Sequence, residues 1–543
     1  MQRANPQIKP QISSFKPLIG RPAPKTFLIP ALVACLAVLI PLAYLFLRAL
    51  EANPKDLLEI VFRARNLELL LNTVALGLGV VLATTMIALP LAWLTARTNL
   101  PAKGLLTLIG VLPLAVPGYV GAYAMLAATG HNGVLEKLFG FNMPRPEGYF
   151  GALGVLALFS FPYLFLNLWN ALRGLDPSLE ESGRSLGLSQ WQVFWRVILP
   201  QLRPAWLSGA LLIILHVLGD FGVVSLTRYD TFSSAIYLQY NAAYDRVYAA
   251  WLGLMLLVIT VGTLWLESRL LRNIRFSRIG SGVARRQTLV RLGNLMIPGF
   301  GFVIALATVT LLIPLGTVLF WLLGSAALDW SALLFAAQNS AMAAAPTALA
   351  ATFFAIPLAL LGARFASPFT KLLERSAYLG YATPPLALAL AFVFFSLRVI
   401  PDLYQTLAML VIALTIHFLA EAIGPVRASL LQANPKLEEA ARGLGFTSLQ
   451  TFFKVTLVLI RRGVFTSLAL VFLSCLKELP ITFLLAPIGF DTLSKQIFGF
   501  TSESMFAQAA PYALAIVIAS SAMVGLVLMQ EQASNAEISR KTP

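Results

Sequence analysis

Two acidic residues occupy matching positions in two apolar segments that lie far apart in the chain. Asp220 stands in the apolar run 205–226, and Glu478 stands 258 residues later in the run 464–486. A charged group inside such a run is costly unless it has a function or a partner, so both acids are candidates for lining a path for a cation. The alternative is a structural role in hydrogen bonding between helices, with Lys477 as a neighbouring charge of Glu478.

The remaining residues with chemical potential form no recognisable reaction centre. His417 and Glu421 are four residues apart, and this spacing allows them to pair on one face of a helix. The three histidines and two cysteines show no metal-ligand spacing, and the sequence contains no G-x-x-x-x-G-K-[ST] phosphate loop. We therefore expect no catalytic site, no metal centre and no bound cofactor in this chain, and energy for any work must come from elsewhere.

The composition is that of a membrane protein. Of the 543 residues, 58% are hydrophobic and 12% are charged, and the mean hydropathy is +0.78. A soluble domain carries about 25% charged residues and could not cover so apolar a chain with polar groups. The net charge of +16 lies in short segments between apolar runs, which favours contact with membrane lipid and not with nucleic acid.

About twelve apolar runs are long enough to cross a bilayer, since a span needs roughly 20 residues as a helix. Proline residues at positions 384, 385 and 401 interrupt the ninth and tenth runs. The sequence therefore predicts an all-α integral membrane protein with spans at 27–48, 69–94, 104–128, 151–172, 205–226, 248–266, 295–323, 338–362, 374–398, 405–426, 464–486 and 511–529.

Charge between the runs predicts the orientation and the domain limits. The tail 1–26 and the linker 267–294 are rich in Lys and Arg, and six spans separate them. Positive segments stay in the cytoplasm, so we expect both of these, and the tail 530–543, on the cytoplasmic side of the inner membrane. The two six-helix halves would then be residues 27–266 and 295–529.

The two halves repeat one another. Residues 176–181, Asp-Pro-Ser-Leu-Glu-Glu, parallel residues 434–439, Asn-Pro-Lys-Leu-Glu-Glu, and the matches continue beyond at the same offset of 258 residues. Asn72-Thr73 has a looser counterpart in Asn339-Ser340. Each half has an even number of spans, so the sequence predicts two parallel repeats and not the inverted repeats of many secondary transporters.

The repeated segment lies between the fourth and fifth spans of each half. Asp176 and Asn434 are typical helix N-caps followed by proline, and Gly187 and Gly445 are suited to ending the short helix. A second amphipathic piece follows, with Trp191 and Trp195 on its apolar face. We expect a short helix that is exposed at the cytoplasmic surface, either as a docking element or as an ordinary interfacial anchor.

This segment resembles the cytoplasmic Glu-Ala-Ala loop of ABC importer permeases. The resemblance rests on the glutamates, the glycines and the residues that end each copy: Glu181, Gly187, Leu199 and Pro200 in the first, and Glu439, Ala440, Ala441, Gly445 and Leu457 in the second. Ser182 and Gly183 replace the two alanines of the first copy, and Val458 replaces the proline of the second. We expect the two loops to leave their helices at different angles for that reason.

The resemblance implies a fused permease with the type I ABC importer fold. Repeats of that family would cover about 67–266 and 335–529. It also implies two copies of a separate ATPase, which bind ATP and dock on the two loops, and an extracytoplasmic solute-binding protein. Stretches such as 112–120, 219–225 and 231–237 resemble the ferric-iron branch, whose relatives carry thiamine, phosphonate or other small solutes.

Two functions of other classes compete with this reading. An ion-coupled secondary transporter would use Asp220 and Glu478 as a proton relay, although parallel repeats and a doubled cytoplasmic motif argue against it. A membrane-embedded enzyme is disfavoured because no paired catalytic residues are present.

Overall fold

The computed structural model describes residues 24–51, 59, 61–241, 245–271, 289–324, 329–365 and 367–541. Helices dominate this part of the chain, and its one β-contact is an isolated bridge between Thr98 and Val290. The all-α prediction is confirmed. Nearly all of the predicted N-terminal tail and most of the predicted basic linker lie outside the described residues.

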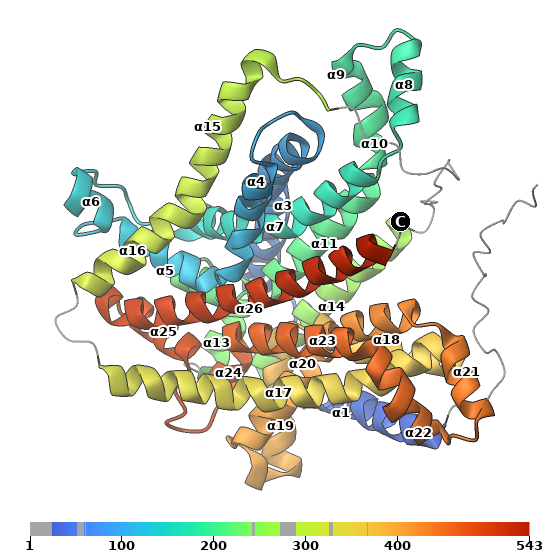
Figure 1. The fold of residues 1–543 in the computed structure, drawn as a ribbon. Helices are drawn as coiled ribbons and strands as arrows, with labels where there is room; N and C mark the ends of the chain where they lie inside the picture. Colours follow the sequence, from blue (N-terminus) through green and yellow to red (C-terminus); the bar gives the residue numbers. More distant parts are fainter. Residues whose placement is uncertain are drawn as a thin grey trace, which may run out of the picture.

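The first half has long helices joined by shorter ones (Figure 1). The long ones are α1 (Lys25–Ala49), α3 (Ala64–Arg97), α7 (Gly148–Gly174), α11 (Arg203–Gly219) and α14 (Arg246–Leu271). The shorter ones include α4 (Lys103–Val111), α5 (Gly118–Ala128), α12 (Gly222–Leu226) and α13 (Phe232–Asn241).

The second half repeats this order. Its long elements are the pair α15 (Met296–Ala307) and α16 (Ile313–Leu323), then α17 (Trp330–Arg364), α20 (Leu407–Gln432), α23 (Leu457–Lys477) and α26 (Phe506–Lys541). Between them lie α18 (Pro368–Ala382), α19 (Pro385–Val399), α24 (Pro480–Leu485) and α25 (Leu493–Ser502).

Twelve membrane spans are consistent with these helices. Within the described residues, nine helices are long and apolar enough to cross a bilayer, and three bent pairs raise the number to twelve. The bends are 95° between α4 and α5, 102° between α18 and α19, and 60° at the start of α11. The predicted runs 104–128 and 374–398 are therefore broken helices, because a proline stands at each break: Pro117 in the first half, and Pro384 with Pro385 in the second.

The same hydrogen bond recurs at the same place in both halves. The Asn72 side-chain amide donates to the carbonyl of Asp230 at 3.0 Å, and that of Asn339 donates to the carbonyl of Asp491 at 3.0 Å. Each bond fastens the first long helix of a repeat, α3 or α17, to the loop that precedes α13 or α25. The looser sequence match at Asn339 therefore belongs to the duplication.

Each half lends its first helix to the other half. Helix α1 packs against α17, α18 and α19, while α15 and α16 pack against α4 and α5. Single contacts fix this exchange: Cys35 Sγ donates to the carbonyl of Leu373 at 3.1 Å, and Trp321 Nε1 donates to the carbonyl of Ala127 at 3.1 Å. The two repeats consequently form one body and not two separable domains.

Small residues allow the helices of each half to approach closely. A Cβ added at Gly463 of α23 would lie 2.6 Å from the carbonyl oxygen of Pro425 and would also collide with the hydroxyl of Ser429, both on α20. Close contact of this kind is a main source of stability between helices in a bilayer, where lipid removes the hydrophobic driving force.

We expect Gly463→Ala to lower the stability of the protein. The added methyl must push α20 and α23 apart, and overpacking of this kind costs about 1–3 kcal/mol. The thermal unfolding of the detergent-solubilised protein measures the effect. Gly77→Ala on α3 is the matched control, since no atom lies within 4 Å of its added Cβ. Equal melting temperatures for the two variants would contradict the close-packing argument.

Candidate functional site

The first repeated segment, residues 176–201, folds into short helices that leave the bundle after α7. Helix α8 (Pro177–Ser185) begins where the Asp176 carboxylate accepts a hydrogen bond from Ser178 N at 3.0 Å. Helix α9 (Gln190–Val193) begins at a capping box formed by Ser189 and Gln192. A π-helical turn (Phe194–Ile198) and α10 (Leu199–Gln201) lead into α11.

The second repeated segment, residues 434–459, is built in the same way. Helix α21 (Pro435–Gly443) begins at Asn434, whose side chain accepts from Lys436 N at 3.0 Å. Helix α22 (Ser448–Thr451) has a Thr447–Gln450 capping box, and a π-helical turn (Phe452–Thr456) leads into α23. Both segments lie on the right-hand side in Figure 1, near the end of the bundle where α1 begins.

Gly187 and Gly445 end the first helix of their segments as predicted. Their φ angles are +82° and +88°, in the left-handed region that side chains rarely adopt. In the first copy Gly187 N donates to the carbonyl of Arg184 and Leu188 N donates to that of Gly183, which is the Schellman pattern of helix ends. No atom lies within 4 Å of a Cβ added at either glycine, so backbone conformation alone calls for glycine here.

The glutamates next to the predicted pair anchor the repeated segments to the bundle. Glu180 forms a buried ion pair with Arg97, the last residue of α3. Glu438 lies 3.3 Å from Arg364, the last residue of α17, whose guanidinium also donates to the carbonyl of Ala433 at 2.9 Å. Sequence reasoning missed the anchoring role of these four residues, although Glu180 and Glu438 stand in matching positions and the arginines follow the predicted spans 69–94 and 338–362 by two or three residues.

The predicted Glu181 and Glu439 point away from these anchors. Both side chains are exposed, as is Ala440, whereas Ala441 is buried against the rest of its segment. Each segment therefore divides its neighbouring glutamates between two environments. One carboxylate holds the helix to the bundle, and the other is free to contact a partner.

The surfaces of both segments expose large apolar side chains. Leu186 is 83% exposed and Leu444, its counterpart, is 79% exposed. Beside them lie the exposed Trp191 and Trp195 in the first segment, and the exposed Leu449 and Phe453 in the second. Exposed apolar groups next to charged groups are typical of a surface that docks another protein or lies against the membrane.

The two segments join their membrane helices differently, as the sequence predicted. A bend of 60° separates 190–201 from α11, whereas residues 448–477 qualify as one span. Pro200 and Pro204 lie at the bend, and Val458 and Arg462 take their places in the second half. Helix α10, which contains Leu199 and Pro200, is therefore a separate short piece, while Leu457 starts the long helix α23 directly.

Asp220 and Glu478 cap short helices within the membrane-spanning bundle. Asp220 Oδ1 accepts from Val223 N at 2.9 Å and caps α12. Glu478 accepts from Ile481 N at 2.5 Å and from Thr482 N at 2.9 Å, and so caps α24. The predicted spans 205–226 and 464–486 therefore break at the acids. The two acids therefore have a structural role, as caps of short helices. A role of the two acids in a solute path remains a proposal.

Two pairings that the sequence allowed are not formed. Lys477 does not pair with Glu478, because its ammonium donates to the carbonyl of Leu114 at 2.9 Å. His417 does not pair with Glu421 on their common helix. The His417 ring contacts the carbonyl of Gly380 at 3.3 Å, and Glu421 accepts a hydrogen bond from Ser474 at 2.8 Å. Contacts between helices have replaced contacts along one helix.

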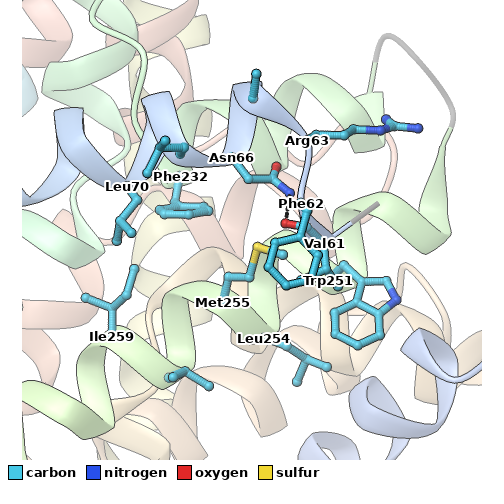
Figure 2. Close-up of a pocket in the computed structure, with 13 residues that line it drawn as sticks. Val61, Phe62, Arg63, Asn66, Leu70, Phe232, Trp251, Leu254, Met255 and Ile259 are labelled. Atoms are coloured by element: carbon cyan, nitrogen blue, oxygen red, sulfur yellow. Dashed lines mark hydrogen bonds between the residues drawn. The ribbon is translucent and has the colours of Figure 1, made fainter. Parts of the chain in front are cut away.

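A groove beside α3 and α14 is apolar. Figure 2 shows this space of about 460 Å³ between the start of α3 and the middle of α14. Arg63 lies at its rim and extends away from it, and the side chain of Asn66 is held by the carbonyl of Val61. A site for a small charged solute needs polar groups that converge on it, and the lining of this groove has none. The apolar residues of the lining include Leu70, Phe232, Trp251, Leu254, Met255 and Ile259.

Comparison with known proteins identifies the fold. Residues 88–276 and 351–533 each match the family model described as "Binding-protein-dependent transport system inner membrane component". The chain is 33% identical over 497 residues to the Fe(3+)-transport system permease protein FbpB 2 of Haemophilus influenzae, which covers 91% of this chain and 96% of that protein.

Other relatives match one part of the chain. The molybdenum transport system permease protein ModB of Escherichia coli is 34% identical over 157 residues, 28% of this chain and 69% of its own length. The sulfate transport system permease protein CysT of the same species is 27% identical over 194 residues, 36% of this chain and 70% of its own length. With two matching repeats and a relative that aligns over nearly its whole length, the chain belongs to the inner-membrane permeases of binding-protein-dependent ABC importers, as a fused, duplicated member of that family.

Proposed function

We propose that this permease forms the path by which ferric iron crosses the inner membrane. The relative named for Fe(3+) transport aligns with both halves of the chain, whereas those named for molybdenum and sulfate cover about a third of it or less. Related permeases for thiamine, phosphonate or another small solute are the alternative. Iron would arrive on an extracytoplasmic binding protein that docks on the face opposite the repeated segments.

We further propose that two copies of a separate ATPase dock on the two repeated segments. The observation that supports this is the duplicated arrangement itself: exposed Leu186 and Leu444 beside helices that buried Glu180 and Glu438 anchor to the bundle. One chain thereby offers two docking surfaces at the same end. ATP would be bound by the partner subunits, since the sequence has no phosphate loop.

Uptake by the reconstituted transporter tests which solute is carried. We expect proteoliposomes that contain the permease, its ATPase and its binding protein to accumulate ferric iron when ATP is supplied on the ATPase side. Molybdate and sulfate should not be accumulated. Uptake that follows a proton gradient without ATP hydrolysis would instead support the secondary transporter, and ATP-driven uptake of another solute alone would refute the assignment of iron.

The orientation of the chain is part of the same proposal. Reporter fusions at the N-terminus and within the linker 267–294 should report the cytoplasm, because those regions carry the positive charge that is retained on that side. A fusion at the C-terminus should report the cytoplasm as well, because six predicted spans separate it from the linker. Fusions within 129–150 and 228–247 should report the outer side. A linker found outside the cell would overturn the parallel arrangement of the halves in the membrane.

We expect Gly187→Val and Gly445→Val to uncouple the permease from its ATPase. A side chain in the left-handed conformation costs about 1–2 kcal/mol, so the helix end that shapes the docking surface should rearrange while the bundle stays intact. Co-purification of the ATPase and ATP-driven uptake are the two measurements.

Matched controls use the positions two residues earlier. Ser185→Val and Gly443→Val place the same side chain in the helices that end at these residues, without the left-handed backbone. They should retain the ATPase. Full ATPase binding and full uptake in both glycine variants would refute the coupling role.

A further inference from the structure

Polar side chains gather in the bundle between the two halves, away from the repeated segments and just before the caps at Asp220 and Glu478. They come from α7 and α11 of the first half and from α18, α20 and α23 of the second. The members are Tyr163, His216, Tyr381, Glu421, Ser474 and Lys477. We call them the central polar cluster.

Glu421 is the centre of this cluster. Its Oε1 accepts a hydrogen bond from Ser474 Oγ at 2.8 Å, and one turn earlier on α20 the His417 ring stacks on that of Tyr381 at 5.8 Å. The Tyr163 ring lies 5.7 Å from that of His216. A carboxylate on a membrane helix that is bonded to a hydroxyl of a neighbouring helix is the expensive arrangement expected of a functional site.

The cluster faces an internal space. His216 and Tyr381 lie where the halves meet, since a Cβ added at Gly219, at the end of α11, would lie 3.0 Å from Pro385 at the break between α18 and α19. Both side chains are nevertheless exposed, Tyr381 by 43% of its surface, and Glu421 and Lys477 are only half-buried. Exposed polar groups at this place indicate a water-accessible opening between the halves and not a sealed core.

The duplication places this opening on the axis that relates the halves. Tyr163 and Glu421 are separated by the repeat offset of 258 residues, and so are His216 and Ser474. Residues at equivalent positions that face one another must lie on either side of the symmetry axis. A permease path shared by two repeats has to follow that axis, and these residues therefore stand beside it.

We propose that Glu421, together with Tyr163 and Tyr381, forms the transit site at which the permease passes a hard metal cation from one side of the membrane to the other. The proposal rests on the proposed ferric-iron function and adds the residues that handle the ion. Carboxylate and phenol oxygens are the hard ligands that such an ion prefers. No three His, Cys, Asp or Glu side chains converge in the described parts of the chain, so the site is suited to brief contact and not to storage.

Lys477 fits this role as a counter-charge. Its ammonium is held by the carbonyl of Leu114 at 2.9 Å, and on α23 it lies one turn beyond Ser474, the residue that donates to Glu421. The carboxylate is thereby partly neutralised when no ion is present. A cation in transit competes with this fixed positive charge, which weakens its binding and favours release.

Replacing Glu421 tests the transit site. In the reconstituted transporter, Glu421→Gln should lower ferric uptake about ten-fold or more. The free energy of one contact to a charged group is typically large enough to change a rate or an affinity by that factor. Glu421→Asp, which keeps the charge, should retain more uptake, and Tyr163→Phe should cause a smaller loss. Binding of the ATPase should be unchanged in all three, since the repeated segments are untouched.

The opposite pattern would overturn the proposal. If Glu421→Gln imports iron as the wild type does while Lys477→Met abolishes uptake, the path recognises an anion. A wild type that imports no ferric iron would refute the solute and the cation specificity together. Glu421→Gln can also lower uptake by misfolding. Its melting temperature should therefore be compared with that of Ser474→Ala, which removes the hydroxyl group that donates a hydrogen bond to Glu421.

Cysteine labelling decides separately whether the cluster lies on the path. In a chain with Cys35 and Cys475 replaced by serine, His216→Cys should react with a small, charged, membrane-impermeant thiol reagent when ATP is supplied to the full transporter. Val258→Cys, exposed on α14 in the lining of the apolar groove, should not react. No labelling of His216→Cys in any nucleotide state would exclude the cluster from the path, whatever the solute.

Discussion

The buried ion pair between an arginine at the end of a membrane helix and a glutamate in the repeated segment is the contact on which the working of this fold depends. Arg97 with Glu180, and Arg364 with Glu438, are almost inaccessible to water. Removing one partner of such a pair costs about 3–5 kcal/mol, because the other charge stays buried. Each short helix is therefore fastened to α3 or α17, and a force applied to the helix by a docked subunit passes directly into the bundle.

The exchange of the first helices decides where that force can act. Since α1 packs on the second half and α15 and α16 pack on the first, neither half can move away from the other as a free body. Relative motion has to occur by small shifts about the shared axis. This is the region where the central polar cluster lies, and a few ångströms of movement between α7, α11, α20 and α23 would change the access to Glu421.

Sequence patterns predicted the elements of this fold far better than the contacts between them. Span positions, the caps at Asp176 and Asn434 and the glycines at 187 and 445 follow from local chemistry, which needs no knowledge of neighbours. Glu180 and Glu438 could not be distinguished from the exposed glutamates beside them, because the choice depends on an arginine more than 70 residues away. For the same reason His417 and Glu421, well spaced for a pair along one helix, proved to have partners on other helices.

Fusion of the two halves into one chain allows an asymmetry that a dimer of identical halves cannot have. At the position equivalent to Glu421 the first half has Tyr163 and not a second glutamate, and Lys477 takes the place of Gly219. Two carboxylates close to one another would repel each other. A phenol at one of the two positions, with a lysine in the second half alone, avoids that repulsion. The same freedom separates the two repeated segments, where Pro200 bends one connection and Val458 leaves the other within a single span. Duplication thus provided the architecture, and divergence between the copies made the two halves chemically different at equivalent positions.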